Sequence, residues 1–120
     1  MKSTSCSAQV NNNSECHQAI INTYLNKIKS ASNEFYDDYY TKLPSVMYYT
    51  VSVKQIVSEK SNSIITFISY PYLGPHDTIG IHKITFVADY MGNLEVKEFS
   101  HIVSYHLPDN LKKLEKKPIP

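Results

Sequence analysis

The feature that most constrains the fold of this chain is a change in hydrophobic period at Pro44. Before Pro44, apolar residues such as Ile21, Leu25 and Ile28 recur three or four positions apart, which is the spacing of one helix face. After it, apolar and polar residues alternate, as from Met47 to Lys54, which is the spacing of a strand. A helical segment followed by strands alone predicts an α+β fold.

The helical part predicts one long helix. Asn12, Asn13 and Ser14 offer N-cap side chains, and the apolar spacing continues to Thr41, so the helix is expected from Ser14 to Thr41. The Ser30–Asn33 cluster of small polar residues is where it would bend or break.

The second part predicts four strands, Met47–Lys54, Ile64–Tyr72, Ile81–Ala88 and Leu94–Val103. The connections between them are short, which favours an antiparallel meander. With the helix laid across the curved sheet, the expected order is α-β-β-β-β, as in cystatin-like folds.

The last turn predicts the register of the final two strands. A three-residue loop ending in a left-handed Gly92 places Phe86 and Val96 on one face. The same register places His82 and His101 on opposite faces, whereas an even-length loop would make them cross-strand neighbours. We therefore expect no metal site from this histidine pair.

Composition limits the size and the partners of the protein. A chain of 120 residues fits one domain, with a flexible arm at 1–13, a domain at 14–106 and a lysine-rich tail at 107–120, where Asp109 can cap a short helix. The 12 Lys and Arg residues nearly balance the 11 Asp and Glu residues, so no nucleic-acid partner is expected. No apolar run approaches the roughly 18 residues of a membrane span, so no transmembrane segment is expected.

The two cysteines do not identify the cellular compartment in which the protein works. A Cys6–Cys16 bridge is geometrically possible if the protein is exported, whereas free thiols are expected if it is cytosolic. The start Met1–Ser5 is not followed by the apolar core of a signal peptide. The protein is therefore either cytosolic or a mature chain whose signal has been removed.

The candidate site is the loop Tyr70–Gly80, in which Gly74 and Pro75 precede His76 and Asp77. A histidine beside a carboxylate can act as a general base, a metal ligand or a pH switch. The alternative is an Asx-type turn at Asp77 beside a surface histidine. No nucleophile or second acid can be placed beside the pair, so its expected role is contact with a ligand or partner, without metal or cofactor.

Tyrosine is abundant, with 10 residues, and suits both strand faces and contact surfaces. The run Phe35–Tyr40 is expected to supply core aromatics with a solvated acidic edge. Alternatively, it joins Tyr48, Tyr70 and Tyr72 in a patch that grips a peptide or glycan.

Several segments together resemble a known family. They are Val51–Ile56, the Gly74–Asp77 loop, Ile84–Phe86 and Val96–Phe99. In this order they are similar to domain of unknown function 3888, a family of small exported proteins of Gram-positive spore formers, over about Glu15 to His101. The resemblance implies export and a shared fold but no mechanism. The chain departs from it at Asp77, where Asn is expected.

These observations favour a secreted, non-enzymatic binding module that contacts a protein, peptide or cell-envelope component. Its expected contact residues are His76, Asp77, Tyr70, Tyr72 and Tyr48, and its expected state is a monomer or weak dimer. The alternative is a small metal-dependent or acid/base enzyme that uses His76 and Asp77 in a pocket between helix and sheet.

Overall fold

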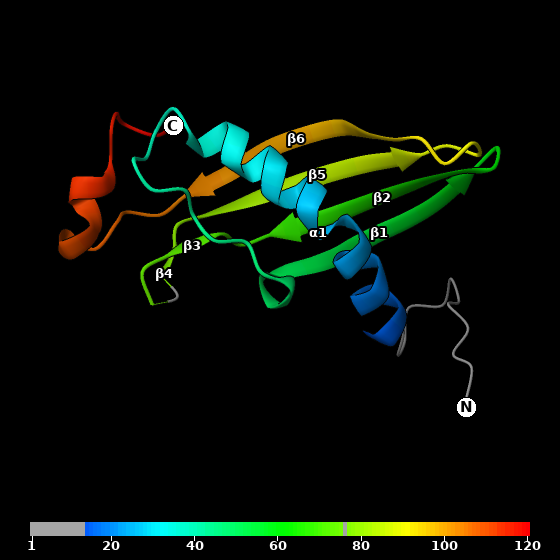
Figure 1. The fold of residues 1–120 in the computed structure, drawn as a ribbon, viewed down its shortest axis with the longest axis horizontal. Helices are drawn as coiled ribbons and strands as arrows, with labels where there is room; N and C mark the ends of the chain where they lie inside the picture. The colour runs from blue at the N-terminus through cyan, green and yellow to red at the C-terminus, as the bar shows by residue number, and fades with distance from the viewer. Residues whose placement is uncertain (1–13, 76) are drawn as a thin grey trace.

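The structure is a computed structural model that describes residues 14–75 and 77–120. One helix, α1 (Ser14–Tyr36), crosses a face of a four-stranded antiparallel sheet, which confirms the predicted α+β fold (Figure 1). The sheet is open, with the order β1-β2-β5-β6. Its strands are β1 (Val51–Glu59), β2 (Asn62–Ser69), β5 (Gly80–Ala88) and β6 (Leu94–Ser104). The predicted arm at 1–13 lies outside the described residues.

Helix α1 is continuous through Ser30–Asn33 but ends at Tyr36, before the predicted Thr41. The Tyr39 N–H donates to the Tyr36 carbonyl (2.9 Å), which closes the helix in a tight turn. Tyr40 then forms an isolated β-bridge with Glu115. The predicted end was wrong because a contact far along the chain redirects a segment that has helical spacing.

The first strand also begins later than predicted. Tyr48–Thr50 forms a short 3-10 helix, η1, and β1 starts at Val51. The Thr50 hydroxyl donates to the Met47 carbonyl (2.9 Å) and accepts from the Met47 N–H (3.1 Å). This side chain supplies the backbone groups of Met47 with partners that a neighbouring strand would otherwise provide.

A small hairpin interrupts the meander between β2 and β5. The second strand ends at Ser69, not at the predicted Tyr72, and the chain then forms β3 (Tyr72–Leu73) and β4 (Asp77–Thr78), which pair with each other. Pro71 explains the break, because proline has no N–H to donate to a ladder.

The register of β5 and β6 is as predicted near the turn and different beyond it. Gly92 has a φ of +85°, and Phe86 pairs with Val96. Lys97 is then an extra residue on β6, a β-bulge, so the side chains from Glu98 to His101 change face until a second extra residue, Ile102, shifts the register again. His82 consequently pairs with His101, and the prediction that they lie on opposite faces was wrong.

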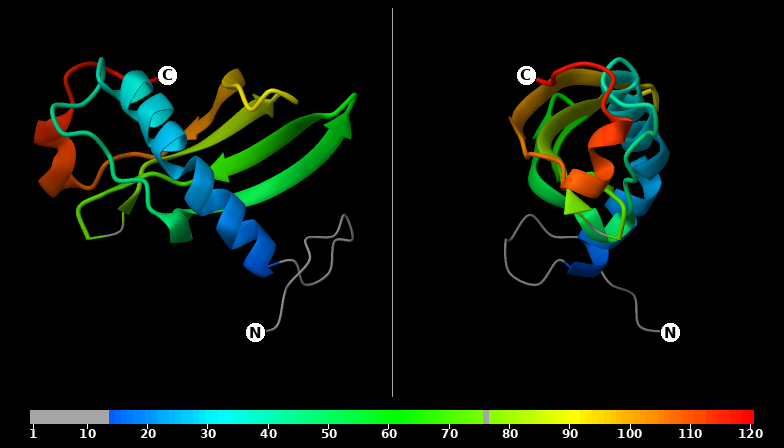
Figure 2. Two further views of the ribbon diagram at one scale, coloured as in Figure 1. Left: turned by 45° about the vertical axis from the view of Figure 1, so that its right-hand side comes forward. Right: turned by 90° about the vertical axis from the view of Figure 1, so that its left-hand side faces the viewer.

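The chain builds two hydrophobic cores. The first lies between α1 and the sheet and contains Ile21, Tyr24, Ile28, Val46, Val51, Ile65, Phe67, Ile84 and Phe86. The second lies beyond the C-terminal end of α1 and contains Tyr36, Tyr40, Leu73, Ile79 and Leu107. Figure 2 shows that α1 covers one face of the sheet and leaves the other face uncovered.

The C-terminal segment packs against the second core through a 3-10 helix, η2 (Asp109–Leu114). Leu111 and Leu114 contact this core, and the Thr41 N–H donates to the Leu114 carbonyl (2.7 Å). Among the described residues, no helix has the length and hydropathy needed to cross a membrane.

Candidate functional site

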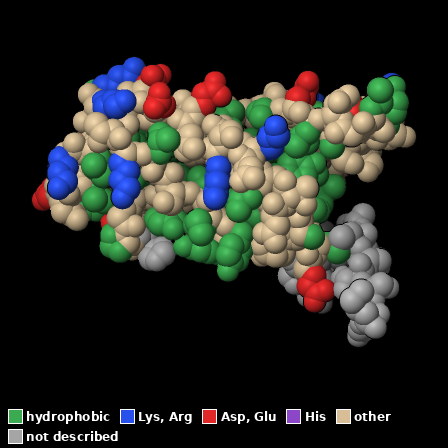
Figure 3. All heavy atoms as spheres, in the orientation of Figure 1, with side chains coloured by type: hydrophobic (Ala, Val, Ile, Leu, Met, Phe, Trp, Pro, Cys, Tyr) green, Lys and Arg blue, Asp and Glu red, His purple; other side chains and the backbone are tan. Residues whose placement is uncertain are grey.

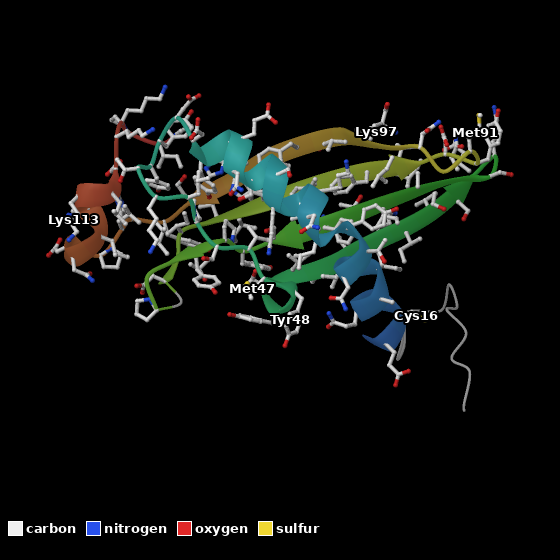
Figure 4. All side chains as sticks on the ribbon, in the orientation of Figure 1. Cys16, Met47, Tyr48, Met91, Lys97 and Lys113 are labelled. Carbon is white, nitrogen blue, oxygen red and sulfur yellow. The ribbon has the colours of Figure 1, made fainter. Side chains whose placement is uncertain are left out.

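Three aromatic rings are in contact on the surface where η1 meets β3. We call Tyr48, Tyr49 and Tyr72 the tyrosine surface. Tyr48 is 48% exposed, Tyr49 is 53% exposed and Tyr72 is half-buried. Hydrophobic side chains gather along the lower edge of the view in Figure 3, where Figure 4 labels Met47 and Tyr48.

Tyr49 joins the rings of this surface. Its ring stacks on that of Tyr72 with centroids 6.5 Å apart and planes 25° apart, and their hydroxyl oxygens lie 3.1 Å apart. The Tyr48 ring meets the Tyr49 ring edge-on at 5.3 Å. Tyr48 and Tyr72 were predicted contact residues but Tyr49 was not, because strand alternation from Met47 would place Tyr49 on the same face as Val51.

Backbone hydrogen bonds hold the tyrosine surface in place. Ser45 and Tyr72 exchange two of them, at 2.8 Å and 3.1 Å. The N–H of Tyr70, another predicted contact residue, donates to the Thr50 carbonyl (2.9 Å), which ties the start of the hairpin to η1. Tyr70 is 40% exposed beside the surface. The rings are therefore preorganised for contact.

The hydrogen bond with Tyr72 raises the pKa of the Tyr49 hydroxyl above its ordinary value. The Tyr49 hydroxyl therefore stays protonated at physiological pH. A hollow of about 270 Å³ lies beside the surface and is lined in part by Leu43, Val46 and Met47.

The loop that was predicted to carry the site is described only in part. His76 lies outside the described residues, so its role and the His76–Asp77 pair stay predictions. Asp77 is half-buried and pairs with Leu73 across the small hairpin. Gly74 turns the chain with a φ of +59°, and a Cβ added there would lie 3.3 Å from Oδ2 of Asp77. The turn therefore brings the backbone and this carboxylate close together.

A second cluster surrounds the pair of histidines that β5 and β6 bring together. The rings of His82 and His101 lie 4.9 Å apart, and Phe35 of α1 packs on both. His82 Nε2 lies 2.7 Å from the Tyr36 hydroxyl. Burial, followed by the charge of His101, lowers the pKa of His82 to about 3. His82 is therefore neutral at physiological pH and has little basicity for proton transfer.

No group of three or more His, Cys, Asp or Glu side chains within 14–75 and 77–120 could hold a metal ion. Cys16 is buried in α1 and has no free thiol. Its predicted partner, Cys6, lies outside the described residues, so their pairing stays a prediction.

Comparison with known proteins identifies a family. Residues 17–103, most of the chain, match a family model described as "Protein of unknown function (DUF3888)". No curated protein and no solved structure matches the chain.

Proposed function

The chain belongs to the family of proteins of unknown function DUF3888, and from that premise we propose that it is a non-enzymatic binding module that contacts its partner through the tyrosine surface. The observation that carries the proposal is the exposed stack of Tyr49 on Tyr72. Tyrosine is enriched at protein interfaces because its rigid ring gives much contact area for little lost entropy.

The partner that best suits this surface is an extended peptide or protein segment. The rings offer flat apolar faces, and their hydroxyl groups can bond to a peptide backbone. The adjacent hollow, lined in part by Leu43, Val46 and Met47, is large enough for an aliphatic side chain of the same segment. Asp77 and the predicted contact residue His76 would then lie at the margin of the interface.

The binding test compares Tyr49→Ala with Tyr90→Ala. Tyr90 is 75% exposed at the turn between β5 and β6, so its variant removes a ring that is even more accessible than Tyr49, at the other end of the sheet. Peptides are first selected on the wild-type protein from a displayed random library. Loss of an interface anchor typically costs about 2 kcal/mol or more, which is roughly 30-fold in Kd.

We expect the selected peptides to lose at least about tenfold in affinity for Tyr49→Ala and to bind Tyr90→Ala like the wild type. Equal binding to both variants, or peptides that lose affinity only for Tyr90→Ala, would refute the tyrosine surface as the contact site. A cell-envelope glycan that binds the wild type when no peptide does would change the class of partner.

We also propose that the protein acts outside the cytoplasm. The resemblance described above and the absence of a free thiol at Cys16 support this location, because disulfides persist in oxidising compartments. Quantifying the protein in fractionated source cells tests it, and recovery in the cytosol with reduced Cys6 and Cys16 would contradict it. The Gram-positive origin and the cystatin-like architecture stay predictions.

A further inference from the structure

The face of the sheet that α1 leaves uncovered carries apolar side chains where a face in water usually carries polar ones (Figure 2). Strand β2 shows this most clearly. Its residues Ile65 and Phe67 are buried under α1, yet Ile64 and Ile68, which point to the opposite face, are apolar as well. In a strand with one face in water, these two positions would be expected to be polar.

The register of the sheet extends this apolar character to the neighbouring strands. Ile64 pairs with Val57 of β1 and with Val87 of β5, so the three side chains share the uncovered face. Ile81 lies on the same face, an even number of residues before Val87 on β5. Val57 is exposed, and the other members are half-buried. We call this set the apolar sheet face; its residues are Val57, Ile64, Ile68, Ile81 and Val87.

The middle of the apolar sheet face holds two threonines that bond to each other. Thr66 and Thr85 are paired across β2 and β5, and their hydroxyl oxygens lie 3.1 Å apart. Both residues are buried, although α1 lies over the other face. A polar group that already has a partner costs less to remove from water than one without. A second surface could therefore cover the centre of this face at little cost.

Charged side chains of both signs surround the apolar sheet face. Lys83 of β5 is half-buried, and Glu95 and Glu98 of β6 are exposed. All three lie on the uncovered face, since Val87 pairs with Glu95 and Thr85 pairs with Glu98. A two-fold axis brings such a surface against itself, so the lysine of one copy can meet the glutamates of the other. The formal net charge of the chain is only +1, so two copies repel each other little.

We propose that two copies of this chain associate through the apolar sheet face, with their sheets packed face to face. Four strands about 4.8 Å apart, each with about eight residues of about 3.3 Å, give roughly 500 Å² for one face. Two faces then bury roughly 1,000 Å², which is near the lower limit for a specific interface. We therefore expect a weak, reversible dimer with a Kd on the order of 10–100 μM. The tyrosine surface has no residue in this face, so dimerisation and peptide binding are tested separately.

Sedimentation equilibrium of the full chain, from about 5 μM to about 1 mM, measures the Kd of the dimer. Val57→Glu places a charge on the apolar sheet face. Ile56→Glu is the matched control, because Ile56 is the preceding residue on the same edge strand and is also exposed, but shares its face with the buried Ile65. A two-fold interface contains each residue twice, so we expect Val57→Glu to raise the Kd at least about tenfold and Ile56→Glu to leave it unchanged.

A second measurement locates the contact in the wild type and does not depend on any variant. The NMR signals of the Ile64 and Val87 methyl groups should shift as the protein concentration rises, whereas that of the Ile56 methyl groups should not. Far-UV circular dichroism checks that both variants are folded.

The proposal is overturned if the wild type stays monomeric up to about 1 mM, or if Val57→Glu and Ile56→Glu weaken the dimer equally. Concentration-dependent shifts confined to another surface would also overturn it. Vesicles of phosphatidylcholine and phosphatidylglycerol are tested in parallel. Binding of a monomer to them that is lost only in Val57→Glu would assign the apolar sheet face to a lipid surface and rule out the second copy.

Discussion

His82 is a fully buried side chain between two others that can titrate. Tyr36 of α1 meets its Nε2, and His101 of β6 lies beside its ring. Its Nδ1 is buried and has no hydrogen-bond partner in the described part of the chain. A proton on His82 would therefore bring a charge into a site without a counter-ion, which explains the low pKa.

The low pKa predicts a loss of stability in mild acid. In the unfolded chain, histidine titrates near pH 6.5, whereas folded His82 titrates near pH 3. Between pH 6.5 and pH 3, only the unfolded state takes up this proton. His82 therefore makes its full contribution to stability above pH 6.5, and this contribution is lost progressively as the pH falls towards 3. We expect a loss of about 2 kcal/mol from this group between pH 7 and pH 5.

Urea unfolding of the wild type and of His82→Gln at both pH values measures the effect. The variant lacks the titrating group, so its stability should change much less between pH 7 and pH 5. His106→Gln is the control, because His106 is exposed, and it should keep the wild-type dependence. Identical pH dependence in wild type and His82→Gln would show that His82 is not the cause.

At the scale of single residues, the sequence indicated where aromatic rings gather, but it did not indicate which rings are in contact. The predicted contact residues Tyr48 and Tyr72 both lie against the Tyr49 ring, and their role in binding stays a prediction. The partnership of His82 with His101 was not predictable from the turn, since one extra residue between them reverses which face a side chain occupies.

Bulges are the local feature that sets the geometry of the sheet strands. Lys54 is an extra residue on β1, and Lys97 and Ile102 are extra residues on β6. Lys97 lies near the solvent edge of the sheet (Figure 4), so the bulge exposes a charged residue and buries none. After it, Phe99 and His101 face α1, where Phe35 contacts both rings.

Because Lys97 is the extra residue of the bulge, we expect its presence in the chain to matter more for stability than the chemistry of its side chain. Deleting Lys97 would move Phe99 and His101 to the uncovered face, and we expect a loss of at least about 3 kcal/mol. Lys97→Ala keeps the extra residue and should change the free energy of unfolding by no more than about 0.5 kcal/mol. Denaturant unfolding of both variants makes the comparison. A deletion as stable as Lys97→Ala would mean that β6 restores its register elsewhere.

The elements themselves were largely predictable, and their ends were not. Periods of 3.6 and 2 residues identified α1 and the four long strands, because each buries one face. The hairpin of β3 and β4 was treated as a loop, since two-residue strands show no period. The ends of α1 and of the first strand depend on Glu115 and Thr50, through a distant bridge and a side-chain hydrogen bond that no local pattern reveals.

The whole molecule is held together by two cores, and the second joins distant parts of the chain. Leu107 is buried in it beside Tyr36 and Tyr40 of the helical end and Leu73 of the small hairpin. The Lys116 N–H donates to the Tyr39 carbonyl (2.6 Å), so the C-terminal segment also pairs with the chain that follows α1. Residues 107–120 therefore lie against the rest of the structure along most of their length.

Truncation of Leu107 should weaken this attachment. A buried leucine changed to alanine typically costs about 2–5 kcal/mol, and we expect a value in that range for Leu107→Ala. The amides of Thr41 and Lys116 should lose protection against hydrogen exchange, because both bond across the joint. Leu43→Ala is the control, since Leu43 is 39% exposed, and it should cost far less. Equal losses in both variants would contradict the anchoring role.

At the scale of the whole molecule, the sequence predicted the first hydrophobic core but not the second. The helix-on-sheet core follows from two amphipathic patterns that must cover each other. The second core brings together residues from three segments that are distant in the sequence, and each contributes only one or two fully buried side chains. No window of sequence contains enough of them to reveal a shared core.

The bulges also affect how molecules of this protein can associate with one another. Strands β1 and β6 are the two open edges of the sheet, and a straight edge is a template on which another chain can add a strand. Here each edge strand is interrupted, by Lys54 on one side and by Lys97 and Ile102 on the other. A second molecule would find the evenly spaced backbone groups of each edge interrupted, so we expect both edges to be poor templates for growth into fibrils.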